Sequence, residues 1–152
     1  MQWMLPCDYL IMSFKMKKIS ILGSTGSIGR SALKVIGENP GKFRIIGLCA
    51  GRNIKLLADQ IKRFKPSCVS VMLPDDEKRL RKLLGSVACK NLRVYSGEHG
   101  AAEIASLKDV DTVLSSIVGS AGLKPTLAAI KAGKRVALAN KESIVMAGRL
   151  ML

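Results

Sequence analysis

The chain has 152 residues, enough for one domain with a single buried core. Hydrophobic residues make up 48% of it and charged residues 24%, a balance that excludes an intrinsically disordered chain. The formal net charge of +14 predicts a missing acidic partner or an anionic one, such as nucleic acid, a membrane surface or a phosphorylated ligand.

The first residues differ from the rest of the chain. Residues 1–16 are partly apolar, but Pro6 and Asp8 interrupt the apolar run and positive charge comes late. A secretory signal needs early positive charge and a continuous apolar core, and a membrane span needs about 20 apolar residues. We therefore predict that residues 1–16 are an extension, disordered or not native, with Met16 as the natural start. The domain is expected at residues 17–152, with no membrane segment.

The four cysteines, one of them Cys7, indicate a reducing compartment. None forms a C-x-x-C pair, and Cys49 and Cys68 fall in apolar runs, where a free thiol behaves as a small hydrophobe. We expect free thiols and a cytoplasmic protein.

Short apolar runs alternate with helical patterns from residue 19 onward. Strands are predicted at residues 19–22, 43–50, 68–73, 92–95, 112–118 and 135–139. Helices are predicted around residues 28–38, 54–64, 74–84, 101–107, 125–132 and 142–152. Asn53 is expected to be the N-cap of the second helix. This alternation, without an Asn-Gly or Asp-Gly hairpin, predicts an α/β fold. We expect a Rossmann-like, doubly wound and mainly parallel sheet with helices on both faces.

Apolar residues mark one face of each of the first three helices, and the face of the second has the spacing of a helix that lies on a sheet. These positions are Ile28, Ala32 and Ile36 in the first helix, Ile54, Leu57, Ala58, Ile61 and Phe64 in the second, and Leu80, Leu83 and Leu84 in the third. The third helix also carries the densest basic group, after three acidic residues at 75–77. For that group, which contains Lys78, Arg79, Arg81 and Lys82, we predict a solvated helix face.

A glycine-rich loop joins the first strand to the first helix. Gly23, Gly26 and Gly29 have the spacing G-x-x-G-x-x-G. Gly23 and Gly26 let the backbone turn sharply and approach a diphosphate, Gly29 lets the helix pack close to the strand, and the helix N-terminus offers unpaired N–H groups. Further hydroxyl donors come from Ser24, Thr25 and Ser27. This context predicts dinucleotide binding, and a glycine-rich turn without a ligand is the alternative.

The end of the second strand indicates which dinucleotide is bound. NAD-binding domains usually carry an acidic residue there, about 20 residues past the loop, to hold the ribose 2′-hydroxyl. This chain has no acidic residue between Glu38 and Asp59, and the strand leads instead into Gly51, Arg52 and Asn53. A guanidinium suits a 2′-phosphate by charge and by bidentate geometry. The sequence favours NADP over NAD, with an ordinary surface arginine as the alternative.

Two later strand ends also carry candidate residues. The small residues at 119–122 permit close approach of a cofactor or tight packing of a turn. After the last strand come Asn140, Lys141, Glu142 and Ser143. A helix N-terminus explains Glu142 and Ser143 but does not favour the positive charge of Lys141. Lys141 is therefore our best candidate for a residue that faces a substrate.

Taken together, residues 18–29, 50–53, 117–127 and 138–143 resemble the 1-deoxy-D-xylulose 5-phosphate reductoisomerases in order and spacing. The resemblance covers residue 17 to the end, and the run at 138–143 is its most distinctive piece. It implies an NADPH-dependent enzyme of non-mevalonate isoprenoid biosynthesis. That enzyme rearranges and reduces 1-deoxy-D-xylulose 5-phosphate to 2-C-methyl-D-erythritol 4-phosphate.

The resemblance also implies roles for single residues. Many members have Lys at the position of Arg52, and both side chains are basic. It implies that the diphosphate is bound by Thr25, Gly26, Ser27 and Ile28, and the adenosine ribose phosphate by Gly51, Arg52 and Asn53. It also implies that Asn140 and Glu142 lie by the nicotinamide end and that Lys141 contacts the substrate.

Other features of that family lie in catalytic and C-terminal domains that we do not find in this sequence. There acidic residues hold a divalent metal, Mg or Mn, and further residues hold the sugar phosphate. The candidate carboxylate pair for a metal in this sequence, Asp109 and Asp111, precedes a strand and is predicted to lie in a solvated turn. We expect a fragment that binds NADPH without turnover, with apolar surface left exposed on the last helix. When full length, the protein is expected to be a homodimer with no nucleic-acid or membrane partner.

Other functions agree less well with the sequence. A short-chain dehydrogenase needs a Tyr-x-x-x-Lys pair, but Tyr95 is followed at that distance by His99, which we predict to be a surface residue. Nothing around Cys89 supports the nucleophile of a semialdehyde dehydrogenase. A basic nucleic-acid module would want interleaved aromatic residues or a basic recognition helix. That module and an inactive remnant without enzymatic activity remain the alternatives.

Overall fold

The computed structural model describes residues 16–151, apart from the side chains of residues 87, 88, 98, 150 and 151. The predicted N-terminal extension, except Met16, lies outside the described residues, and so do Cys7 and Leu152.

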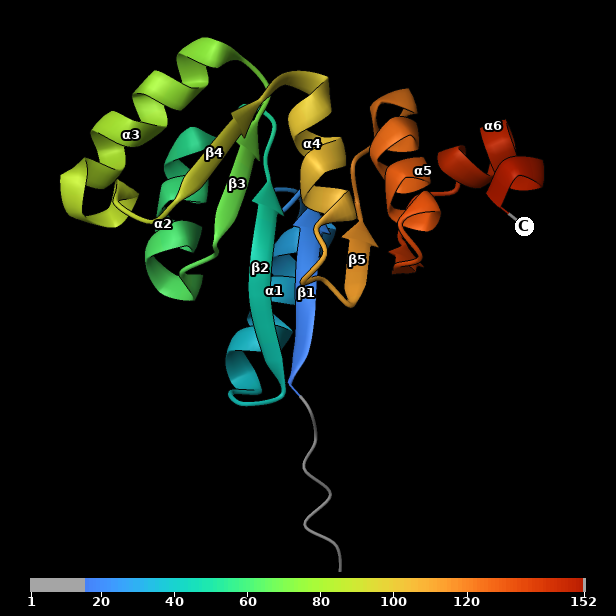
Figure 1. Cartoon of the computed structure of the whole chain (residues 1–152), viewed down its shortest axis with the longest axis horizontal. Coiled ribbons are helices and arrows are strands. Elements are labelled where there is room, and N and C mark those ends of the chain that lie inside the picture. Colours follow the sequence, from blue (N-terminus) through green and yellow to red (C-terminus); the bar gives the residue numbers. More distant parts are fainter. Residues whose placement is uncertain (1–15, 152) are drawn as a thin grey trace, which may run out of the picture.

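Six parallel strands form one sheet in the order β4-β3-β2-β1-β5-β6 (Figure 1). From β1 the chain adds strands outward to β4, then returns to place β5 on the other side of β1. The strand order therefore reverses between β1 and β5, and the predicted doubly wound α/β fold is confirmed. The strands are β1 (Lys17–Leu22), β2 (Phe43–Cys49), β3 (Cys68–Val71), β4 (Arg93–Ser96), β5 (Thr112–Ser115) and β6 (Arg135–Leu138).

Helices cover both faces of the sheet. One face packs against α1 (Ser27–Glu38), α2 (Ile54–Phe64) and α3 (Pro74–Cys89), and the other against α4 (Gly97–Ser106) and α5 (Leu123–Lys131). Figure 1 shows α4 in front of the sheet and α1 behind it. A short 3-10 helix, η1 (Ser120–Gly122), precedes α5, and α6 (Glu142–Met151) follows β6.

Alternation along the strands divides the core into two halves. Successive side chains of a strand point to opposite faces of the sheet. Ile21 and Leu48 therefore pack against α1, α2 and α3, while Leu22 and Cys49 pack against α4 and α5. The few aromatic residues leave most of this packing to aliphatic side chains.

The predicted strands are present, but two of them end more than one residue early. β3 ends at Val71, and β5 ends at Ser115 instead of continuing to Val118. The pairing of β1 with β5 ends at Leu22 and Ser115, because the glycine loop begins directly after Leu22. Ser116 still donates its N–H to the Leu22 carbonyl, but beyond it β1 offers no residue to pair with, and residues 117–118 are part of a loop.

The predicted helical faces are confirmed with two exceptions. Ile28 and Leu83 belong to the predicted apolar faces, but each is 44% exposed. In α1 the buried positions are Gly29 and Leu33, because the start of the helix lies against the glycine loop. In α3, Leu80 and Leu84, one turn apart, contact the core.

The C-terminal helix exposes apolar side chains, as predicted. Ile144, Val145 and Met146 are all largely exposed. The remaining predicted positions, residues 150–152, lie outside the described side chains. Among the described residues, no helix is long and apolar enough to cross a membrane.

Burial changes the chemistry of two thiols. Cys49 and Cys68 are free and buried in their strands, as predicted. Desolvation raises the pKa of the Cys49 thiol to about 11, although hydrogen bonds with the Gly23 backbone and Ser70 oppose the shift. Desolvation likewise raises the pKa of the Cys68 thiol to about 11, against the opposing charge of Arg93. Cys89 is only partly buried.

We predict that iodoacetamide at pH 8 modifies Cys89 in the folded chain and leaves Cys49 and Cys68 intact. With a pKa three units above the solution pH, about one thiol in a thousand is a thiolate, and burial also blocks the reagent. Peptide mass spectrometry after a short pulse measures each site, and unfolding in urea should make all three reactive. Equal modification of the three cysteines in the folded chain would contradict the packing described above.

Candidate cofactor-binding site

A cavity of about 360 Å³ opens at the carboxyl ends of the strands. Gly23 and Gly26 line it after β1, Gly51 after β2, and Ser116 and Val118 after β5. It therefore lies where the strand order reverses. Open α/β sheets bind their ligands at that position.

The glycines of the first loop are required by close packing. Gly23 has φ +86°, and a Cβ there would stand 2.8 Å from the carbonyl oxygen of Ser116. A Cβ on Gly29 would overlap the Gly23 carbonyl oxygen and stand 2.7 Å from the Cα of Ser24. The predicted roles of Gly23 in turning the chain and of Gly29 in close packing are confirmed.

Gly26 differs from the other two glycines. The chain bends at Gly26, but its φ of −75° and ψ of 173° are open to any residue, so the bend does not require glycine. The nearest atom to an added Cβ would be 3.4 Å away. Gly26 lines the cavity instead, and the absence of a side chain leaves room for a ligand at the start of α1.

Hydrogen bonds fix the loop to its neighbours. The N–H groups of Gly23 and Ser24 both donate to the Cys49 carbonyl, at 2.9 and 2.8 Å. The Ser24 hydroxyl donates to Oε1 of Gln60 at 2.8 Å, and Nε2 of Gln60 donates to the Ser24 carbonyl at 2.9 Å. Ser24 is fully buried, so the prediction that its hydroxyl faces a ligand is wrong.

The sequence analysis missed two residues that support the loop. Gln60 is buried in α2 beside Leu57 and Ile61. A polar residue on the apolar face of a helix is a signal that could have identified it. Ser116 donates its hydroxyl to the Leu22 carbonyl at 2.7 Å and to the Gly23 carbonyl at 3.3 Å. Its partners belong to a distant part of the chain, so no local pattern marks it.

The N-terminus of α1 can receive an anion. No side chain caps it, and its first turn contains no acidic residue. Within the described residues, the N–H groups of Ser27, Ile28 and Gly29 have no acceptor. Unpaired N–H groups and the helix dipole together favour a phosphate. With Thr25 and Gly26 lining the adjacent cavity, this end of α1 suits the diphosphate of a dinucleotide.

The end of β2 joins the cavity to a second, basic hollow. Gly51 lines the cavity, and Arg52 and Asn53 line the second hollow. Oδ1 of Asn53 accepts a hydrogen bond from the Leu56 N–H at 3.1 Å, which confirms Asn53 as the N-cap of α2. Arg52 is exposed and forms no ion pair within the described residues.

The residues after β6 lie at the other end of the site. Nδ2 of Asn140 donates to the Ile117 carbonyl, so it ties this strand end to the loop after β5. Its Oδ1 is buried without a partner among the described residues. Lys141 is exposed and Glu142 is half-buried at the start of α6, and neither lines the cavity. Their contacts with cofactor and substrate stay predictions.

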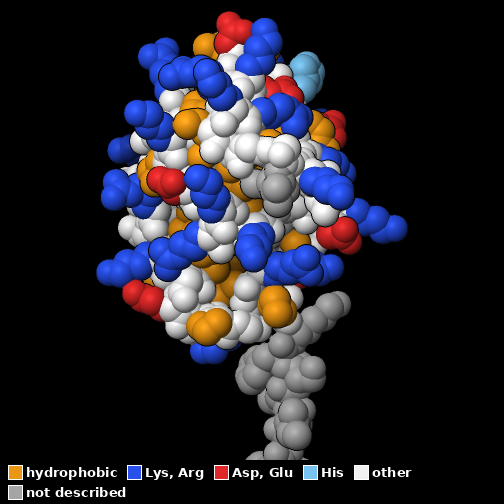
Figure 2. Space-filling model, turned by 90° about the vertical axis from the view of Figure 1, so that its left-hand side faces the viewer, with side chains coloured by type: hydrophobic (Ala, Val, Ile, Leu, Met, Phe, Trp, Pro, Cys, Tyr) orange, Lys and Arg blue, Asp and Glu red, His pale blue; other side chains and the backbone are white. Residues whose placement is uncertain are grey.

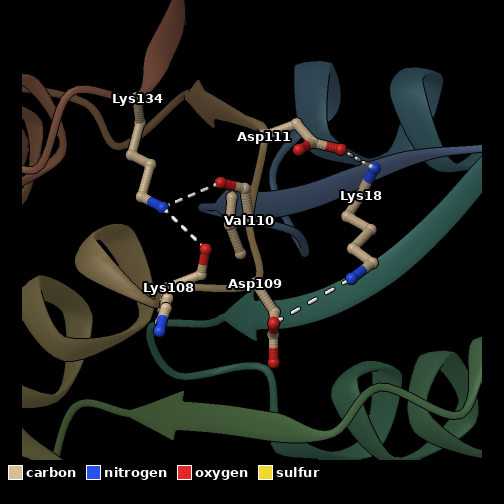
Figure 3. Close-up of polar contacts among 6 residues, drawn as sticks. All are labelled: Lys18, Lys108, Asp109, Val110, Asp111 and Lys134. Carbon is tan, nitrogen blue, oxygen red and sulfur yellow. Dashed lines mark hydrogen bonds and ion pairs between the residues drawn. The ribbon is translucent and has the colours of Figure 1, made fainter.

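The carboxylate pair of the sequence analysis lies at the opposite, amino-terminal edge of the sheet. Oδ2 of Asp111 accepts from the backbone N–H of Lys18 at 2.9 Å, and Oδ1 of Asp109 is 3.9 Å from Nζ of Lys18 (Figure 3). Lys134 donates to two carbonyl groups of the same turn. Both carboxylates are exposed, so the predicted solvated turn is confirmed. The described residues contain no group of three or more His, Cys, Asp or Glu that could hold a metal ion.

The reversed strand order, the glycine loop and the uncapped helix define a dinucleotide-binding domain of the Rossmann-like type. The sequence model of 1-deoxy-D-xylulose 5-phosphate reductoisomerase matches residues 19–148. The chain belongs to this family.

Similar proteins agree with this assignment. The reductoisomerase of Pelodictyon phaeoclathratiforme is 54% identical over 136 residues, and that of Photorhabdus laumondii 49% over 137. A solved reductoisomerase from Zymomonas mobilis in complex with NADPH is 41% identical, with a TM-score of 0.82, and another in complex with magnesium gives 42% and 0.84. In each comparison 90% of this chain is covered. The chain spans about a third of the length of these relatives, between 34% and 35%.

Replacing Gly23 tests the packing of the loop. We predict that Gly23→Ala lowers the free energy of unfolding by roughly 2–4 kcal/mol, because a left-handed backbone and a steric overlap both act against alanine. Gly41 is a matched control, since it has the same φ of +86° and open space around its Cβ position. Gly41→Ala should cost only about 1–2 kcal/mol. Urea unfolding measures both variants, and equal losses would show that Gly23 is not packed against Ser116.

Proposed function

We propose that this chain binds NADPH and forms the cofactor-binding part of a 1-deoxy-D-xylulose 5-phosphate reductoisomerase. The observation that carries the proposal is the uncapped N-terminus of α1 beside the glycine-lined cavity. Those groups suit a diphosphate, and the basic end of β2 suits a further phosphate. The solved relative in complex with NADPH, 41% identical to this chain, supports the choice of cofactor.

The diphosphate is proposed to lie against the backbone of the loop and of the first turn of α1. Ser27 and Ile28 supply unpaired N–H groups there, Thr25 and Gly26 line the adjacent cavity, and Gly23 leaves space for the turn. The burial of Ser24 and its bonds to Gln60 hold the loop in place before a ligand arrives. Binding therefore costs little ordering of the loop.

The adenosine half of the cofactor is proposed to extend past β2. Gly51 has nothing within 4 Å of its Cβ position, so the backbone there is open to a ligand. Arg52 supplies a guanidinium for the 2′-phosphate, and Asn53 supplies backbone groups while its side chain caps α2.

The nicotinamide end is proposed to lie near Asn140 and Glu142. Bound NADPH supplies a hydride to the substrate. Asn140 holds the loop after β5 through the Ile117 carbonyl, so it fixes the end of the site at which the nicotinamide is proposed to lie. The exposed ammonium of Lys141 attracts a phosphorylated sugar.

For the whole enzyme we propose the family reaction, from 1-deoxy-D-xylulose 5-phosphate to 2-C-methyl-D-erythritol 4-phosphate. The proposal includes a divalent metal, Mg or Mn, and a homodimer in the cytoplasm without a nucleic-acid partner. The described residues hold no fitting set of metal ligands, so we assign them no step of the metal chemistry. We expect this part of the protein to bind cofactor without turnover.

We predict that NADPH raises the melting temperature of the chain and that NADH does so much less at equal concentration. A ligand that binds only the folded state stabilises it by linkage. Arg52→Gln should weaken NADPH binding roughly 10- to 100-fold, because a charge-assisted contact contributes about 1.5–3 kcal/mol, and should leave NADH binding unchanged. Nicotinamide fluorescence gives both affinities.

Arg44→Gln is the control for that experiment, because Arg44 lies at the amino-terminal edge of the sheet, far along β2 from Arg52. It removes the same charge and should not change NADPH binding. A folded chain that binds neither cofactor would overturn the proposed function and favour an inactive remnant.

A further inference from the structure

The second hollow, about 800 Å³ in volume, lies between the start of α2 and the middle of α3. We call it the basic basin. Figure 2 views the α2 and α3 side of the molecule and shows many lysine and arginine side chains there. The residues that line the basin are Arg52, Asn53, Ile54, Lys55, Arg79, Lys82 and Leu83.

Helix α3 separates its basic residues into two groups. Lys78 pairs with Asp75 at 3.4 Å, and Arg81 pairs with Glu77 at 2.8 Å. These two residues form the solvated face that the sequence predicts. Arg79 and Lys82, three residues apart, line the basin and are also exposed, so the predicted solvated face is confirmed for them too.

The basin carries more positive charge than its surroundings neutralise. Arg79 pairs with Asp76 at 3.2 Å, and the side chain of Asp76 is only 8% exposed. The buried carboxylate of Asp76 therefore holds Nη1 of the Arg79 guanidinium in place. Within residues 16–151, Arg52, Lys55 and Lys82 form no ion pair and no side-chain hydrogen bond. Cations that line one hollow repel each other unless an anion lies between them.

Two further features fit a nucleotide better than a free ion. The basin begins at Arg52, directly after Gly51 of the cofactor cavity, so one extended ligand can occupy both. Leu83, which is 44% exposed, adds an apolar wall to the basin. A base with an attached phosphate presents an apolar face and a charge together.

We propose that Lys55, Arg79 and Lys82 complete, with Arg52, a site for the 2′-phosphoadenosine part of the cofactor. Helix α3 then helps to select NADP over NAD, in addition to the end of β2. This inference rests on the proposed function, because it assumes that the glycine loop binds the rest of the same dinucleotide. It assigns a ligand to three basic residues that the family resemblance leaves without a role.

The test measures the binding of four ligands by isothermal titration calorimetry. NADPH and 2′,5′-ADP carry the 2′-phosphate, and NADH and 5′-AMP lack it. Lys82→Gln should weaken the binding of NADPH and of 2′,5′-ADP roughly three-fold. The double variant with Arg79→Gln and Lys82→Gln should weaken it roughly ten-fold. Binding of NADH and 5′-AMP should stay within about two-fold of the unmodified chain, since exposed charges act mainly on the phosphate.

Lys78→Gln is the matched control, because it lies on the same helix, carries the same charge and does not line the basin. Arg79→Gln leaves the buried Asp76 without its partner, so the double variant loses stability. Lys82→Gln and Lys55→Gln remove no ion pair and keep the test independent of folding.

The two proposals fail in different ways. A folded chain that binds no dinucleotide overturns the proposed function and this inference with it. NADPH binding that is unchanged in Lys82→Gln and Lys55→Gln overturns only the inference. A loss that is equal for NADPH and NADH also overturns it, because the basin would then act on a part common to both cofactors.

Discussion

The close approach of Gly23 to the loop after β5 is the constraint on which the site depends. Without a Cβ on Gly29 the first turn of α1 packs directly on the glycine loop, and without a Cβ on Gly23 that loop packs on Ser116. That contact brings the uncapped end of α1 to the carboxyl edge of the sheet, between the two halves of the strand order. A larger residue at either glycine would move the unpaired N–H groups away from the cavity.

In the proposed cofactor site, neutral groups and charged groups bind different parts of the cofactor. Backbone N–H groups at the start of α1 recognise a diphosphate, which NAD and NADP share. The cations beyond β2 lie near the position expected for the 2′-phosphate, which only NADP carries. Affinity and cofactor choice can therefore be changed separately. The same division accounts for part of the net charge of +14.

Local patterns predicted the fold and the loop well. Helix and strand periods, Gly23 and the cap at Asn53 are properties of neighbouring residues, and the structure agrees with them. The sequence could not predict the end of β5, because it depends on where β1 stops. The support from Gln60 and Ser116 was missed for a similar reason, since each acts on a residue far away in sequence.

Amide chemical shifts during a titration with NADPH test the central claim most directly. In a ¹H–¹⁵N correlation spectrum of the folded chain, we predict saturable changes that are largest at Thr25, Gly26, Ser27 and Ile28. Changes at Gly51 and Arg52 should follow the same binding curve. Saturable binding that leaves residues 25–28 unaffected, with changes confined to the turn at residues 108–111, would contradict the account.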